Sequence, residues 1–114
     1  MGARTNFELK DYKGSVWLYS HWGGDTKAND LAAAISNAEP RWGDTPYAMR
    51  MVISYFLKDD VMGETGYGIS SYECGEESYE PISVNFVTNT VDYQDIIYTF
   101  EEYVQMFSKR LTNA

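Results

Sequence analysis

The spacing of apolar residues along this chain changes period several times, and the order of those periods limits the folds open to it. Apolar residues fall on one helical stripe in three segments. These segments are residues 26–38, 46–58 and 100–111. Pro40 ends the first, and Thr45 followed by Pro46 suits the start of the second as N-cap and first helical residue. Thr99 and Glu102 match a capping box before the third, so we expect three helices.

Between these segments the sequence is typical of β-strands. β-Branched and aromatic residues alternate with polar residues or run together, with turn residues between the runs. The expected strands are residues 6–12, 15–21, 65–72, 81–87 and 90–98. No repeat or linker interrupts the chain, so we expect a single domain over residues 1–114. This order predicts an α+β fold, an antiparallel β-sheet with about three helices packed on one face as a two-layer sandwich.

Charge is divided unevenly along the chain. The formal net charge is −8, and residues 59–102 hold eleven Asp or Glu but neither Lys nor Arg, whereas residues 1–58 hold six acids and seven bases. Because a negative field repels phosphate backbones, we expect no direct nucleic-acid binding. The acidic half is either a solvated face or a surface that imitates nucleic acid and docks on a basic partner. Its candidate partner-binding residues are Glu73, Glu76, Glu77 and Glu80.

Other features of the sequence indicate the compartment. The chain has no apolar run near the roughly 18 residues that span a membrane, and its first residues lack the apolar core of a signal peptide. Cys74 is the only cysteine and cannot form an internal disulfide, as is usual in a reducing cytoplasm. We therefore expect a cytoplasmic protein that acts away from membranes.

Two loops of similar composition each precede a predicted helix. The first holds the only histidine, His21, beside a tryptophan and two glycines that leave backbone amides unobstructed. The second holds Arg41, and Tyr47 and Arg50 share a face of the helix that follows. Because guanidinium groups suit phosphate and indole rings suit base stacking, the loops predict one pocket for a nucleotide-like, phosphorylated small molecule. Its candidate ligand-binding residues are His21, Trp22, Gly23, Gly24, Arg41, Trp42, Tyr47 and Arg50.

Structural roles for the same residues stay open at this point. Both tryptophans can anchor the core, and His21 can be a hydrogen-bonded structural residue. Both arginines can pair with neighbouring carboxylates. Those carboxylates are Asp25, Glu39 and Asp44. Asp25 or Thr26 can also cap the first helix, which would occupy part of the anion site.

Catalysis has little support in the sequence. A single histidine excludes a two-histidine phosphoesterase and disfavours a zinc site, which normally has three or four His, Cys or carboxylate ligands. The glutamates around Cys74 disfavour an ionised, nucleophilic thiolate. The acidic residues between 76 and 80 lack the spacing of an EF-hand. We expect no enzymatic activity, no cofactor and no metal ion.

The predicted pocket is weak for a single subunit. Two charged hydrogen bonds, one stacked base and one helix terminus sum to roughly 6–7 kcal/mol before ordering costs. Micromolar affinity needs about 8 kcal/mol. A site shared across a homodimer would close this gap, so the nucleotide hypothesis favours a homodimer.

Three segments resemble a group of small proteins encoded by bacteriophages and prophages. The segments are "WLYSHWGG", "RWGDTPYAMRMVIS" and "GETGYGIS", and the group shares an L-Y-x-H-W-G-G opening, an R-W-x-D-x-x-Y-x-x-R segment and a G-x-G-I strand. The resemblance covers about residues 16–70 and leaves the acidic half outside it. It implies a viral accessory protein in the cytoplasm of a bacterial host, and small phage proteins commonly block host defences.

Two functions follow as expectations. In the first, the chain is a phage-type counter-defence protein that binds and sequesters a phosphorylated small molecule, a nucleotide signal in the first place, without chemistry. In the alternative, it is an acidic inhibitor that docks on a basic host defence protein such as a nuclease. The two differ in partner, because the first requires local positive charge and the second requires negative charge.

Overall fold

Alternating side chains in the first two strands decide which face of the sheet is covered. The computed structural model describes residues 3–75 and 79–108. In β1 (Thr5–Lys10), Phe7 and Leu9 are fully buried, and Glu8 between them is on the opposite face. β2 (Ser15–Ser20) pairs with β1 and buries Leu18 opposite Phe7. The apolar face of this hairpin supports the helices.

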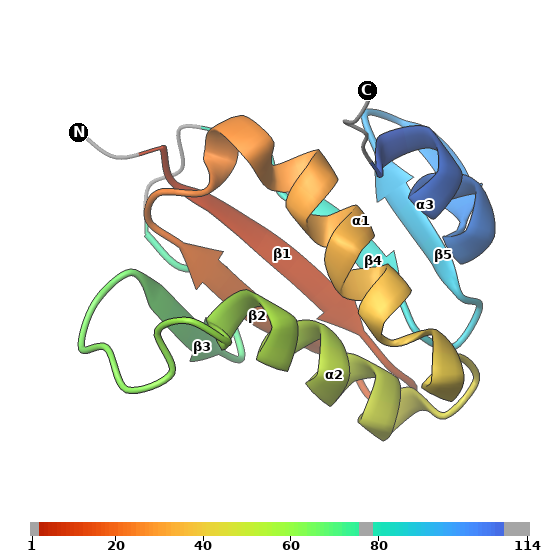
Figure 1. Cartoon of the computed structure of the whole chain (residues 1–114), viewed down its shortest axis with the longest axis horizontal. Coiled ribbons are helices and arrows are strands. Elements are labelled where there is room, and N and C mark those ends of the chain that lie inside the picture. Colours follow the sequence, from red (N-terminus) through yellow and green to blue (C-terminus); the bar gives the residue numbers. More distant parts are fainter. Residues whose placement is uncertain (1–2, 76–78, 109–114) are drawn as a thin grey trace.

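Three helices lie on that face of a six-stranded sheet, as Figure 1 shows. The helices are α1 (Lys27–Asn37), α2 (Thr45–Leu57) and α3 (Phe100–Phe107). The remaining strands are β3 (Tyr67–Ser70), β4 (Ile82–Asn85), β5 (Thr90–Tyr93) and β6 (Ile96–Thr99). The α+β class and a helix in each predicted segment are confirmed. The expected continuation of the third helix beyond residue 108 lies outside the described residues.

The sheet differs from the purely antiparallel prediction in one pairing. The strand order is β3-β2-β1-β4-β5-β6, and β1 and β4 are parallel while the other neighbours are antiparallel. β3 lies at one edge of the sheet and β4 pairs with the other side of β1 in the same direction, so the chain passes two strands between β3 and β4. A parallel pair needs such a crossover connection. The crossover is the acidic segment between β3 and β4. The sequence predicts a strand on each side of this segment, but it does not predict which strand β4 pairs with.

The segment predicted as one strand over residues 90–98 is a hairpin instead. β5 and β6 pair antiparallel, and Gln94 and Asp95 form the turn with φ of +54° and +66°. Two consecutive positive φ values are typical of the tight turns that connect hairpins, which usually contain Asn-Gly or Asp-Gly. Because Gln-Asp is not such a pair, this turn could hardly be predicted from the sequence.

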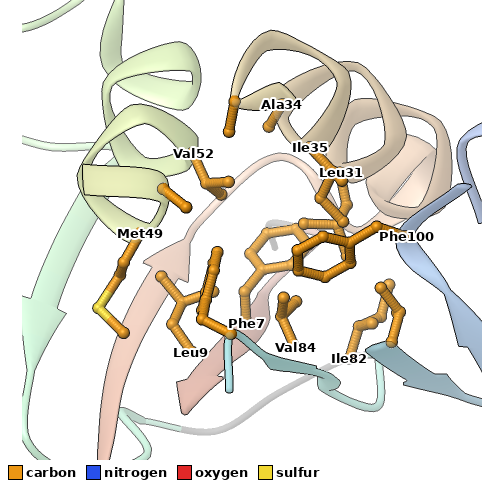
Figure 2. Close-up of a cluster of buried hydrophobic side chains, with 14 of the residues drawn as sticks. Phe7, Leu9, Leu31, Ala34, Ile35, Met49, Val52, Ile82, Val84 and Phe100 are labelled. Carbon is orange, nitrogen blue, oxygen red and sulfur yellow. The ribbon is translucent and has the colours of Figure 1, made fainter. Parts of the chain in front are cut away.

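The core lies between the sheet and the helices. Leu31 and Ile35 of α1 and Val52 of α2 are fully buried against the strands. Figure 2 shows these helix side chains in one cluster with Phe7 of β1 and Phe100 at the start of α3. Burying a side chain of this size contributes about 1.5–3 kcal/mol, so this layer dominates the stability of the fold.

Helix starts confirm one predicted cap and correct two others. The Thr99 and Glu102 capping box is present at the start of α3. Thr45 is the first residue of α2 and not its N-cap, because its hydroxyl donates to the Phe86 carbonyl across the core. Thr26 precedes α1 without a side-chain cap, since its hydroxyl donates to Asp30, and Asp25 accepts a hydrogen bond from another segment.

Candidate functional site

The HWGG loop meets the start of β3 at one edge of the sheet. β2 ends at Ser20, and the backbone N–H of His21 donates to the Gly66 carbonyl at 2.9 Å. Gly66 has a φ of +103°, a conformation that glycine adopts without strain. Two of the three segments that carry the phage-protein resemblance, HWGG and GYGI, are therefore neighbours in space. The site prediction included the first of these and missed the second.

Aromatic side chains from both segments line a cavity of about 460 Å³, which we call the aromatic cavity. Its lining residues are Tyr19, His21, Trp22, Thr65, Gly66 and Tyr67. The Tyr19 hydroxyl is hydrogen bonded to His21 Nδ1 at 2.8 Å, which fixes the imidazole. The His21 and Trp22 rings meet edge to face with centroids 4.3 Å apart. Trp22 is 67% exposed, so its indole can contact a ligand.

Carboxylates lie near two residues of the aromatic cavity, Gly66 and Tyr67. A β-carbon built on Gly66 would lie 3.8 Å from Asp60 Oδ2 and 3.9 Å from Trp22 Nε1, so the carboxylate and the indole N–H border the same space. Partial burial raises the pKa of the Tyr67 hydroxyl, and nearby carboxylates raise it further. These carboxylates are Asp30, Asp60 and Asp59. A cation is therefore favoured here and a phosphate is disfavoured.

The two loop glycines serve packing and not anion binding. The Gly23 N–H donates to Ser20 Oγ at 3.0 Å and the Gly24 N–H donates to the Ala3 carbonyl at 2.8 Å, so neither amide is unobstructed as predicted. A β-carbon on Gly24 would lie 2.3 Å from the Tyr79 ring. Gly24 is therefore needed for the close approach of the Tyr79 segment.

The second loop lies at the other end of α1, and the prediction that both loops line one pocket is wrong. A helix of 11 residues is about 16 Å long, and the RWGD loop follows the end of α1 whereas the HWGG loop precedes its start. Figure 1 shows the two loops separated by α1. The described lining of the aromatic cavity includes none of the four candidates from the RWGD loop and α2.

Those four residues have structural partners of their own. Trp42 is a core anchor: its indole N–H donates to the Ile35 carbonyl at 3.0 Å and its ring packs on Phe100 at 5.4 Å. Arg41 lies over the Tyr47 ring at 5.0 Å and forms an exposed ion pair with Asp44. The Arg50 guanidinium donates to Ser54 one turn along α2, on the exposed face of the helix.

A second and larger cavity, of about 770 Å³, lies beside the start of α1. Aromatic rings of Tyr79, Tyr93 and Phe107 line it, together with the carboxylate residues Asp25, Glu80 and Asp95. Lys27 also lines this cavity and is only 7% exposed. Its Nζ donates to the Glu80 backbone carbonyl and lies 5.6 Å from the centre of the Tyr79 ring. We call this the Lys27 cavity. Sequence reasoning missed it, because Lys27 reads as an ordinary residue of a helix first turn.

The acidic crossover is only partly described. Glu73 and Glu80 are exposed, and Glu76 and Glu77 lie outside the described residues. The crossover is held to the sheet by Asn6, whose amide donates to the Cys74 carbonyl and whose carbonyl accepts from the Cys74 N–H. In residues 3–75 and 79–108, no cluster of three or more His, Cys, Asp or Glu side chains is placed to hold a metal ion. Within the same residues, no helix combines the length and apolar character that crossing a membrane requires.

The described lining of the aromatic cavity is aromatic and polar. Beside the hydrogen-bonded Tyr19–His21 pair it holds Trp22 and the hydroxyl groups of Thr65 and Tyr67. Aromatic surfaces with nearby carboxylates recognise cations by cation–π contact and charge pairing. Comparison of this chain with protein-family models, curated proteins and solved structures finds no match.

Proposed function

We propose that this chain is a non-catalytic, phage-type accessory protein that docks on a basic surface of a host defence protein such as a nuclease. One observation carries the proposal. The Asp60 carboxylate lies 3.8 Å from the β-carbon position of Gly66, which lines the aromatic cavity, whereas Arg41, after α1, and Arg50, within α2, are outside its described lining. A basic surface gains from that charge, and a phosphorylated ligand would be repelled by it.

Exposed apolar residues beside the aromatic cavity support docking on a protein. Val61 is 66% exposed, Met62 is 90% exposed and Ile69 on the edge strand β3 is 54% exposed. Val61 and Ile69 line a small adjoining cavity with Asp60 and Tyr67, so the apolar residues and the aromatic rings form one surface. Aromatic residues and Met are enriched in protein–protein interfaces, and exposed apolar patches mark such interfaces.

A charge reversal tests this proposal on the intact chain. The probe is an oligo-arginine peptide, and its affinity is measured by calorimetry at low and at physiological salt. We expect affinity to fall with added salt, because exposed charges are screened within about 8 Å at physiological ionic strength. Asp60→Lys should weaken binding about tenfold or more.

Asp92→Lys is the matched control. Asp92 is exposed on β5, and three strands separate β5 from β3, a distance of about 19 Å. The substitution changes net charge by the same amount as Asp60→Lys. Equal weakening by the two variants would show that only the overall charge matters, and salt-independent binding would contradict the proposal.

The crossover is tested separately. The double variant Glu73→Lys and Glu80→Lys reverses the two described carboxylates of the acidic segment, both of which are exposed. If the docking surface extends over this segment, the double variant should weaken the oligo-arginine peptide beyond Asp60→Lys alone. An unchanged affinity would confine the surface to the aromatic cavity and its border.

A second function, sequestration of a phosphorylated small molecule, is favoured by one feature of the Lys27 cavity. A buried amine lies at the base of a cavity whose volume is within the range of about 300–1,000 Å³ usual for small-molecule sites. Three carboxylates in the lining oppose an anion there, which is why docking on a basic protein is the preferred function.

A thermal-shift screen separates the two functions. Mono-, di- and cyclic nucleotides are tested, and a ligand at about 100 times its dissociation constant should stabilise the fold by about 2.7 kcal/mol. Chromatography of the recovered nucleotide then shows whether it was altered. A shift in melting temperature that Lys27→Met removes would establish the second function. If no nucleotide shifts the melting temperature, docking on a basic protein is the sole remaining proposal.

A further inference from the structure

We propose that the aromatic cavity is an anchor site for one arginine side chain of the basic partner. This inference rests on the proposed docking function and names the group that the cavity recognises. The cavity presents ring faces and edges from two strands, and its volume of about 460 Å³ is at the small end of ligand pockets. This volume is sufficient for a single long side chain.

The aromatic rings suit a planar cation. Trp22 offers an exposed indole, and the edge-to-face contact with His21 holds the two rings at an interplanar angle of 85°. The hydrogen bond between the Tyr19 hydroxyl and His21 Nδ1 keeps the imidazole in place. A guanidinium group stacks on such faces and is weakly hydrated, so it loses little on leaving water. The rings are therefore arranged before a ligand arrives.

The charge at the edge of the rings selects against neutral and anionic groups. Asp60 Oδ2 and Trp22 Nε1 both lie within 4 Å of the β-carbon position of Gly66, so a carboxylate is near the indole on which a guanidinium would stack. Lys58, two residues before Asp60, pairs with Asp59 at 3.7 Å and lies over the Tyr55 ring, 3.9 Å from its centre. Arginine can thus stack on the rings and also donate charged hydrogen bonds to the carboxylate. A nucleobase can stack in the same way, but it carries no positive charge to pair with the carboxylate.

Gly66 keeps this arrangement open. Any side chain at position 66 would begin between the Asp60 carboxylate and the Trp22 indole, within 4 Å of both. Its φ of +103° also disfavours every residue with a β-carbon. The absent side chain leaves the carboxylate and the ring accessible to one bound group at the same time. Gly66 is in this sense a specificity-determining position of the cavity.

Three peptides that differ at one position test the inference. They carry arginine, lysine or citrulline in an otherwise identical neutral sequence, and citrulline has nearly the shape of arginine without its charge. Their affinities for the full chain are measured by calorimetry, with chemical shifts of the His21 ring as a local readout. We expect arginine to bind about tenfold more tightly than citrulline and several-fold more tightly than lysine. Only the arginine peptide should move the His21 signals strongly.

Two variants and a matched control locate the contact. Trp22→Ala should weaken the arginine peptide about tenfold, and Asp60→Asn should remove most of its advantage over citrulline. Tyr12→Ala is the control, because Tyr12 is a 77% exposed aromatic residue in the β1–β2 turn, outside the described lining of the aromatic cavity. Equal affinities for the three peptides, or equal weakening by Tyr12→Ala and Trp22→Ala, would overturn the inference.

The outcomes also separate this inference from the function on which it rests. If the oligo-arginine peptide binds with strong salt dependence and Trp22→Ala leaves its affinity unchanged, docking stands and the anchor site is refuted. If neither the oligo-arginine peptide nor the single-arginine peptide binds, the docking function itself fails. Full support requires salt-dependent binding that both Trp22→Ala and Asp60→Asn weaken.

Discussion

The HWGG and RWGD loops have nearly the same composition and opposite roles. Each places a tryptophan and a glycine before a helix, yet Trp22 is 67% exposed while Trp42 donates to the Ile35 carbonyl and packs on Phe100. The RWGD loop follows the C-terminal end of α1, where the Ile35 carbonyl accepts the Trp42 indole N–H in addition to the Ala38 N–H. The HWGG loop leaves the end of β2, where His21 meets Gly66 beside β3 and Gly24 meets Ala3 and the Tyr79 ring. What the loop touches decides the role of its tryptophan.

The largest expected difference between the loops is in stability. Trp42→Ala should lower the free energy of unfolding by about 3 kcal/mol, because it removes a packed ring and leaves the cavity around Phe100 unfilled. Trp22→Ala should change it by no more than about 0.5 kcal/mol, as is usual for exposed positions. Urea unfolding followed by circular dichroism measures both. Similar losses of unfolding free energy for the two variants would show that Trp42 and Trp22 do not differ in their contribution to the fold.

The glycines of the two loops should differ in the same direction. Gly24→Ala should cost about 2 kcal/mol, because the new methyl group would lie 2.3 Å from the Tyr79 ring and 2.8 Å from the Ala3 carbonyl. Gly43→Ala meets no atom within 4 Å and should cost only about 1 kcal/mol for its φ of +93°. Melting temperatures in one buffer give the ranking. A larger loss at Gly43 would mean that backbone strain outweighs packing in these loops.

Much of the fold could be predicted from local patterns, and the site only in part. The helix stripes and the Thr99–Glu102 capping box depend on neighbours within a few residues, so the sequence is enough to find them. The parallel β1–β4 pair and the Gln94–Asp95 turn depend on where distant segments return. For the site, His21 and Trp22 were found from their residue types. Tyr67 was missed, because a tyrosine in a strand gives no sign of which loop it will face.

Arg41 and Arg50 were misplaced for a reason that simple geometry explains. Loops at the two ends of one helix are separated by its length, here about 16 Å, and cannot line one small pocket directly. The prediction treated two loops as neighbours because each precedes a helix. Loops before consecutive antiparallel helices lie at opposite ends of the pair. Similar composition was therefore a weaker guide than position along the chain.

Alkaline pH should distinguish a core tyrosine from a cavity tyrosine. Tyr103 is fully buried, and its hydroxyl donates to the Ala28 carbonyl. Its pKa is raised, mainly because the ionised form would lose its contact with water. The folded state therefore holds this proton more tightly than the unfolded state, whose tyrosine pKa is about 10. Stability should be constant below about pH 10 and fall above it, with a slope of up to about 1.4 kcal/mol per pH unit from this group.

Tyr103→Phe supplies the control for that slope. It should remove most of the loss above pH 10, at a cost at neutral pH of about 1 kcal/mol for the hydrogen bond to Ala28. Tyr67→Phe should change the slope less, because Tyr67 is 36% exposed. Unfolding free energies at several pH values between 8 and 11 give the result. A slope that Tyr103→Phe leaves unchanged would assign the alkaline loss to other groups.

The smallest expected effect concerns the arginines of the second loop. Arg41 is about half exposed in its ion pair with Asp44, and such surface pairs are screened and contribute about 0–1 kcal/mol. Arg50 contacts only Ser54 of its own helix among the described side-chain hydrogen bonds. Arg41→Ala and Arg50→Ala should therefore shift unfolding by no more than about 0.5 kcal/mol. They should also leave the affinity of the arginine peptide unchanged within twofold, because neither side chain borders the aromatic cavity.

The nucleotide screen makes the same two variants decisive for the comparison between the loops. If a nucleotide binds and Lys27→Met removes it while Arg41→Ala and Arg50→Ala do not, the ligand occupies the Lys27 cavity near the first loop. If Arg50→Ala removes it and Lys27→Met does not, phosphate is bound at the start of α2, and the RWGD loop is a site in its own right. In that case each loop would carry its own ligand, a cation beside Asp60 at the first loop and an anion beside Arg41 and Arg50 at the second.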